Sequence, residues 1–173
     1  MDLATQQRKL LRLFRGTYRL FSDDDNYISR VAQSNHLQEG RRNILLWRIY
    51  VLERTCALTV TLLRQRNILE ETVSAFIEEN NISPFRETQA LAFLDVLGRH
   101  NDHLIASVAQ FELALIKVKQ GDSCSYLVSW SVDPSVILYS LARNIPLEDE
   151  VQEAPYQVLI SRDIPWMFQI WAA

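Results

Sequence analysis

The chain has 173 residues, of which 48% are hydrophobic and 23% charged, and its net charge is −3. This composition predicts one globular domain or two small ones and excludes disorder, because Leu, Ile, Val and Trp are frequent enough for burial to offset the entropy of folding. No apolar run reaches the roughly 18 residues of a membrane span. The amphipathic first residues, MDLATQQRKLLRLF, lack the pattern of a secretory signal, so we expect a cytoplasmic protein.

Charge and proline are unevenly distributed along the sequence. Residues 1–66 carry twelve Lys and Arg against six Asp and Glu, whereas residues 67–173 carry six against fifteen. All five prolines lie in the second part, from Pro84 onward. The first part is therefore compatible with long helices, and the second part is rich in turns.

Apolar residues at helical spacing predict six helices within the first 121 residues. The fourth helix is expected to begin with Asn67 as N-cap and Glu70 three positions later, and the fifth with Ser83 before Pro84. Gly98 and Gly121 are expected to close the last two helices. The expected helices cover residues 5–20, 27–37 (closed near Gly40), 41–66, 67–80, 84–97 and 102–120.

The pattern changes to alternation after residue 121. Residues 125–132 read as a strand, Asp133 and Pro134 start a helix that runs to about residue 142, and residues 148–153 form an acidic loop. Residues 156–160 and 166–171 are expected to form a hairpin across a tight turn at 162–165. We therefore predict an α+β fold, with a helical domain at 1–121 and a small α+β domain at 122–173 whose sheet has about three strands.

The sequence offers few candidates for catalysis or metal binding. His100 and His103 have ligand-like spacing, but no second cluster accompanies them, and we interpret them as a solvated helix start. Cys56 and Cys124 are expected to be free thiols. Glu112 lies in the most apolar helix, and we expect it to pair with an arginine of a neighbouring helix. We therefore predict no catalytic residue and no metal ligand.

Two other functions fit parts of the pattern. A helical DNA-binding regulator would contact DNA through Arg41, Arg42, Arg48 and Arg54, although Glu53 interrupts this basic run and the whole protein is acidic. A helical scaffold would instead self-associate through the aromatic sheet. Both hypotheses remain open at this point.

Short strands that carry aromatic and β-branched residues are suited to binding an extended peptide. Backbone pairing supplies affinity, and pockets for alternate side chains supply selectivity. The residues expected to contact such a peptide alternate along the first two strands: Tyr126, Val128, Trp130, Tyr156, Val158 and Ile160.

Residues 47–171 resemble a family of peptide-modification partner proteins, first described as DNA-binding domains, that work with multinuclear non-haem iron oxidases. The most specific stretch is Leu104, Ala109, Phe111, Glu112, Ala114 and Asp122. The other matching motifs are Trp47-Arg48-Ile-Tyr50, the segment from Phe76 to Phe85, Phe93-Leu94, Asp133-Pro134-Ser-Val-Ile-Leu138 and Val158-Leu-Ile-Ser-Arg162.

The resemblance implies a non-catalytic accessory subunit that binds the leader of a ribosomally made precursor peptide and presents it to the oxidase. The compact form is similar to the partner proteins of methanobactin biosynthesis, in which precursor cysteines become oxazolone and thioamide groups. It further implies a heterodimer whose iron lies in the oxidase, with no cofactor in the accessory subunit. The residues expected at the joint with the partner are Arg48, Arg162, Trp166 and Trp171.

Overall fold

The computed structural model of the protein describes residues 2–80, 82, 85–147 and 153–173. Within these residues eight α-helices accompany one three-stranded antiparallel sheet, so the predicted α+β class is confirmed. The expected cap at Ser83 and Pro84 and most of the expected acidic loop, residues 148–152, lie outside the described part.

Contacts divide the protein into two compact units, and we describe each by itself: unit 1 is Met1–Tyr50 with Glu70–Ile82, and unit 2 is Val51–Leu69 with Ser83–Ala173.

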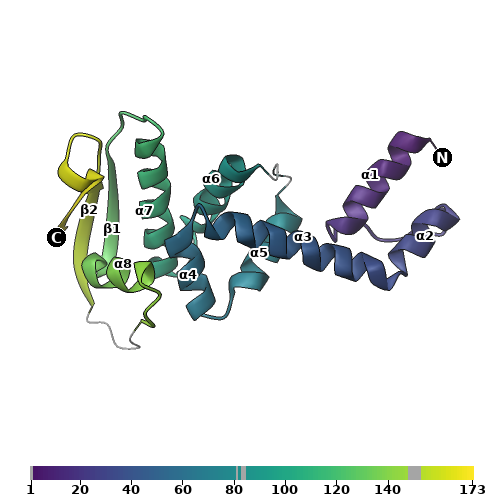
Figure 1. Ribbon diagram of the computed structural model, residues 1–173, viewed down its shortest axis with the longest axis horizontal. Helices are drawn as coiled ribbons and strands as arrows, with labels where there is room; N and C mark the ends of the chain where they lie inside the picture. Colours follow the sequence, from purple (N-terminus) through teal and green to yellow (C-terminus); the bar gives the residue numbers. More distant parts are fainter. Residues whose placement is uncertain (1, 81, 83–84, 148–152) are drawn as a thin grey trace. The chain divides into compact units, whose positions relative to one another are not determined.

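In unit 1, the regular elements of the described residues are all helices (Figure 1). Its elements are α1 (Leu3–Phe14), α2 (Asn26–Ala32), most of α3 (Asn35–Glu53) and most of α5 (Leu69–Glu79). Leu13, Tyr18, Ile28 and Leu37 form a buried cluster in which α1 and α2 contact each other and the start of α3.

The first helix ends six residues earlier than its apolar spacing predicts. Gly16 adopts a φ of +77°, and its N–H donates to the carbonyl of Leu13 at 3.1 Å. The N–H of Thr17 donates to the carbonyl of Arg12 at 3.0 Å. These two bonds form a Schellman motif, which satisfies the last carbonyls and turns the backbone away from the helix axis.

Gly40 lies inside α3 instead of ending the preceding helix, which is a correction to the prediction. A Cβ at this position would lie 2.6 Å from Cε1 of Phe14, so the glycine lets the ring of Phe14 pack against the helix backbone. The close approach of α1 to α3 explains the glycine better than a helix end does.

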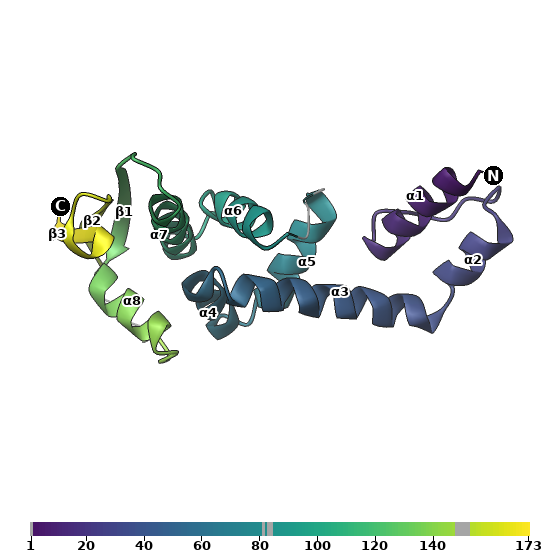
Figure 2. The ribbon, with the colours of Figure 1, turned by 45° about the horizontal axis from the view of Figure 1, so that its top comes forward.

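Among its described residues, unit 2 contains four helices together with the sheet. Figures 1 and 2 both show α7 (His103–Lys119) between the sheet and α6 (Arg86–Leu97). The sheet order is β1 (Tyr126–Val132), β2 (Glu153–Ile160) and β3 (Phe168–Ala172), so the predicted hairpin of the last two strands is confirmed. The remaining elements are α4 (Ala57–Gln65), α8 (Pro134–Ala142) and a 3₁₀ turn, η1 (Pro165–Met167).

The change in composition near residue 121 does not coincide with a division between units. The ring of Phe111, on α7, packs edge-on against Trp130 at a centroid distance of 6.4 Å and against Phe168 at 5.3 Å. Because α7 forms one wall of the core beneath the sheet, residues on both sides of 121 belong to unit 2.

The expected long helix 41–66 is two helices, α3 and α4, separated at Arg54–Cys56. Cys56 occupies the N-cap position of α4 without a side-chain cap bond. Glu112 supplies the cap instead, because its carboxylate accepts the backbone N–H groups of Leu58 and Thr59, both at 2.8 Å. The predicted pairing of Glu112 with an arginine is therefore wrong: main-chain donors at a helix start stabilise this buried carboxylate.

Asn67 closes α4, although its sequence context predicts the start of the following helix. Its φ is +57°, and its N–H donates to the carbonyl of Arg64 at 3.0 Å. The N–H of Ile68 donates to the carbonyl of Leu63, also at 3.0 Å. Asn tolerates the left-handed conformation better than other residues with a Cβ, which makes it suitable for this Schellman position.

Candidate peptide-binding edge of the sheet

The backbone of β3 presents unpaired polar groups on its outer side. In an antiparallel ladder, facing residues alternate between pairs that exchange two hydrogen bonds and pairs that exchange none. Ala173 donates to the carbonyl of Pro155 at 2.9 Å, and Ser161 donates to that of Met167 at 3.0 Å. Residues 167 and 173 thus bond toward β2, and the alternation between them assigns Gln169 and Trp171 to bonded pairs as well. The N–H and C=O groups of Phe168, Ile170 and Ala172 therefore point away from β2.

No other backbone segment within the described residues bonds to this outer side of β3. A row of unpaired donors and acceptors on an edge strand is a template for an additional strand. This row extends over the five residues of β3.

The opposite edge, β1, is partly satisfied by the protein itself. The same alternation along β1 means that the backbone N–H and C=O groups of Leu127 and Ser129 point away from β2. The hydroxyl of Ser107, on α7, donates to the carbonyl of Ser129 at 2.8 Å. A strand added here would have to displace this bond, so β3 is the edge more open to an incoming peptide.

Four of the side chains expected to contact a peptide lie in the core. Successive residues of a strand point to opposite faces, and the structure places these four on the face covered by α7. Trp130 is held there by packing against Phe111, and its Nε1 has no hydrogen-bond partner among the described residues. At most 3% of each of these residues is exposed: Val128, Trp130, Val158 and Ile160.

The two tyrosines of this set are half-buried on the same face. The hydroxyl of Tyr126 donates to Oδ2 of Asp122 at 2.5 Å. This bond raises the pKa of Tyr126 to about 12 and lowers that of Asp122 to about 2. Tyr156 lies on the central strand opposite Trp130. The six residues expected to contact a peptide therefore share one face of β1 and β2, and that face packs on α7.

The opposite face of the sheet carries no buried side chain among the described residues, and we call it the open face. Leu127, Ser129, Gln169 and Trp171 are exposed on it, and Gln157 and Leu159 are half-buried. Leu127 is 57% exposed and Trp171 37%. Apolar side chains that stay exposed on a sheet face beside an unpaired edge are typical of an interaction surface. The sequence pattern favours the other face, because only the structure shows which side α7 covers.

Three of the four residues expected to meet a partner lie at or near β3. Trp166 is 90% exposed in η1, Trp171 lies on the open face, and the exposed Arg162 approaches the carbonyl of Gly121 at 3.5 Å. Arg48 belongs to unit 1, where its guanidinium donates to the carbonyl of Ile82 at 3.3 Å. A role in partner binding stays a prediction for all four.

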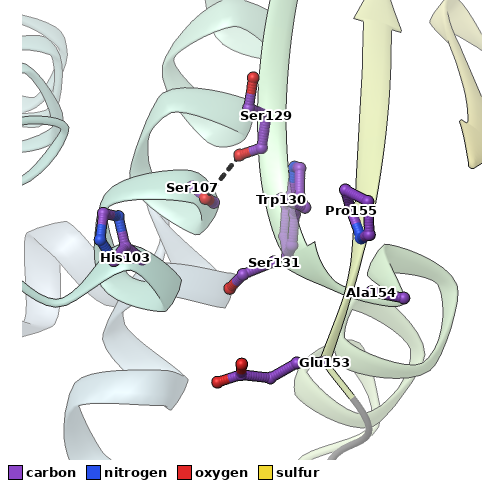
Figure 3. A pocket seen from close by; sticks show the side chains of 8 residues that line it. All are labelled: His103, Ser107, Ser129, Trp130, Ser131, Glu153, Ala154 and Pro155. Atoms are coloured by element: carbon purple, nitrogen blue, oxygen red, sulfur yellow. Dashed lines mark hydrogen bonds between the residues drawn. The ribbon is translucent and has the colours of Figure 1, made fainter. Parts of the chain in front are cut away.

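A cleft of about 540 Å³ with a mainly apolar surface lies beside β1 (Figure 3). His103 and Ser107 reach it from α7, and Glu153 reaches it from the start of β2. The hydroxyl proton of Ser107 is committed to the carbonyl of Ser129, so the arrangement is not that of an activated serine nucleophile. The ladder also shifts its register here, between Trp130 and Val132, where Pro155 is accommodated near the start of the central strand.

The histidines and cysteines considered as metal ligands do not form a metal site within the described residues. In the part of the protein that the structure describes, no three His, Cys, Asp or Glu side chains form a group suited to a metal ion. His100 accepts from the N–H of Asp102 at 3.0 Å through Nδ1, and His103 is exposed at the first position of α7. Cys56 is buried and Cys124 exposed, and both are free thiols, as predicted.

The arginines of the DNA-binding hypothesis differ in their environments. Arg41 is half-buried, and its guanidinium donates twice to the carbonyl of Leu13, at 2.9 and 2.5 Å. Arg48 is likewise bonded to a main-chain carbonyl. Arg42 and Arg54 are exposed. At least two of the four guanidinium groups thus bind main-chain carbonyls of the protein itself.

Comparison with known proteins does not assign the protein to a family. No family model matches it, and no curated protein does. Within the described residues, the structure defines an α+β protein whose β3 edge is unpaired and whose adjoining open face exposes Leu127 and Trp171. Among the helices of the described residues, none combines the length and the apolar character needed to cross a membrane.

Proposed function

We propose that the protein is a non-catalytic accessory subunit that binds the leader of a ribosomally synthesised precursor peptide along β3 and presents it to an iron-dependent oxidase. The chemistry would be of the methanobactin type, with cysteine converted to oxazolone and thioamide groups by iron held in the partner. The observation that carries the peptide-binding part is the unpaired outer side of β3. The oxidase part rests on the sequence resemblance.

The geometry favours an extended peptide as the ligand. A fourth strand would use the outward N–H and C=O groups of Phe168, Ile170 and Ala172, which restores the ladder on that side. Side chains of the added strand on one face would lie next to Phe168 and Ile170, which are half-buried, and on the other face next to Trp171. The edge thus provides both main-chain affinity and apolar neighbours for alternate side chains.

A proline substitution separates pairing at the edge from folding. Ile170→Pro removes an outward N–H and places the proline ring where a new strand would dock, and proline is tolerated on an edge strand at such positions. Gln169→Pro removes an N–H that bonds to β2, so we expect it to disrupt the hairpin. Ile170→Ala keeps the N–H and removes only the side chain, which makes it the matched control.

The test selects a displayed library of random linear peptides on the full-length protein and measures binding of the enriched peptides to each variant. We expect binding to be abolished by Ile170→Pro, with the thermal transition retained, and to persist in Ile170→Ala. Equal binding to wild type and Ile170→Pro, or no enrichment at all, contradicts a peptide site on β3.

The oxidase part is tested by co-expression with a multinuclear iron oxidase encoded beside the gene of this protein. We expect the two proteins to co-purify and the bound iron to stay with the oxidase when they are separated. A genome without such a neighbour, or two proteins that elute separately at micromolar concentration, contradicts this part while leaving peptide binding standing.

A further inference from the structure

The turn before β3 holds a large aromatic side chain in solvent. Trp166 is 90% exposed with a φ of +63°, and Met167 follows with a φ of +65°. Bulky residues rarely adopt this left-handed conformation, and two in succession require a well-determined turn. Met167 N–H donates to the carbonyl of Ile164 at 3.1 Å, and the Met167 carbonyl accepts from Ser161 at 3.0 Å, which fixes this conformation.

The exposed ring of Trp166 contributes little packing that would offset its unfavourable backbone conformation. Glycine adopts a positive φ without steric cost, so a turn selected only for its shape would favour glycine at this position. Asn67 and Asn144 show the tolerated alternative, since both adopt positive φ values and asparagine is suited to them. Strained residues of this kind cluster where a ligand is bound. The structure thus points to a contact with another molecule.

Trp166 marks one end of the open edge. A single residue separates it from Phe168, the first residue of β3, and Ala172 lies at the other end. Both existing strand pairs of the sheet are antiparallel. Antiparallel pairing is also slightly more stable per residue than parallel pairing. A strand added antiparallel to β3 therefore begins beside Ala172 and ends beside Phe168.

We infer that Trp166 is the exit anchor of the bound peptide: the peptide leaves the sheet at this end, and the Trp166 ring packs against the first apolar residue that follows the paired segment. This inference rests on the proposed function and adds a direction and a specificity position to it. Tryptophan buries a large area at low entropic cost and is enriched among residues that dominate binding energy. In a leader–core precursor, the core would then depart from the turn that carries Trp166.

Direction is measured with the peptide that binds most tightly in the library selection, synthesised with a nitroxide at either its N-terminal or its C-terminal end. The Trp166 emission is taken as the difference between wild type and Trp166→Phe. We expect the C-terminal label to quench this emission and the N-terminal label to leave it unchanged. Quenching by the N-terminal label alone overturns the inferred direction.

The contact itself is tested with Trp166→Gly. Because glycine relieves the positive φ, we expect this variant to unfold at a higher temperature than wild type and to bind the peptide about tenfold more weakly or worse. Trp47→Ala removes another exposed tryptophan, on α3 of unit 1, and is expected to leave binding unchanged. Wild-type affinity in Trp166→Gly overturns the exit anchor alone, whereas a wild-type protein that binds no library peptide overturns the proposed function as well.

Discussion

Glu112 and Thr59 are joined by a hydrogen bond from the Thr59 backbone N–H to the Glu112 carboxylate, at 2.8 Å. The other carboxylate oxygen accepts from Leu58, so one residue of α7 caps the start of α4. Burial raises the pKa of Glu112, while the bonds from Thr59 and Leu58 act in the opposite direction. This contact explains how the protein interrupts its longest helical segment without leaving buried N–H groups unsatisfied.

We expect Glu112→Gln to lower the free energy of unfolding by about 1–3 kcal/mol, because the amide NH₂ would face one of the two backbone donors. Urea unfolding at neutral pH measures the loss. Glu87→Gln, at an exposed position in the first turn of α6, is the control and should change stability little. Equal stability of the two variants would show that Glu112 is not the cap of α4.

Substitutions at Asn67 distinguish a helix end from a helix start. With Asn67 in the left-handed C-terminal position, we expect Asn67→Gly to raise the unfolding free energy by up to about 1 kcal/mol and Asn67→Ala to lower it by about 1 kcal/mol. An N-cap would respond differently, since serine would then replace Asn67 with little effect. A stability order of serine above glycine would restore the N-cap interpretation.

Gly40→Ala tests the packing of Phe14 against α3. Alanine favours a helix by about 1 kcal/mol over glycine, but its Cβ would lie 2.6 Å from the Phe14 ring. Displacing a packed ring costs about 1–3 kcal/mol, so we expect a net loss of stability in unit 1. Adding Phe14→Leu should recover part of the loss, and a Gly40→Ala protein more stable than wild type argues against the contact.

The stability of unit 1 should depend on pH through Asp24. Bonds from Lys9 Nζ at 2.5 Å, the Phe21 N–H at 2.8 Å and the Tyr18 hydroxyl at 2.7 Å lower its pKa from 3.8 to about 2. A carboxyl whose pKa is lower in the folded state stabilises the fold above its unfolded pKa, and this contribution is lost as the pH falls through the folded value.

Thermal unfolding of wild type and Asp24→Asn as a function of pH measures this contribution. The advantage of wild type should be full above about pH 4 and should shrink as the pH approaches 2. A constant difference between the two proteins across this range would show that Asp24 is not held ionised by its neighbours.

Much of the architecture is predictable from the sequence because local signals and packing agree there. Asp102, Asp133 and Gly121 mark helix boundaries where the structure has them. The errors arise where a contact between residues far apart in the sequence determines the local structure. The ring of Phe14 accounts for the glycine at position 40, and Glu112 caps a second helix where the apolar pattern predicts one continuous helix. A single sequence contains no local signal for either contact.

The candidate site shows the same limit. Alternation correctly identifies one face of β1 and β2, but not which face α7 covers, so the residues predicted to bind a peptide include four buried ones. Strand order decides which edge is open, and strand order depends on pairing across the whole of unit 2. The aromatic character of Trp166 is evident in the sequence, while its positive φ is visible only in the structure.

Amide hydrogen exchange across β3 tests the strand-addition account most directly, by comparing the free protein with the protein bound to a library-selected peptide. In the free protein we expect slow exchange at Gln169 and Trp171, which bond to β2, and fast exchange at Phe168, Ile170 and Ala172. Peptide binding should slow these three outward amides selectively. Protection that appears instead at Leu127 and Ser129, or at no amide of the sheet, would contradict the account.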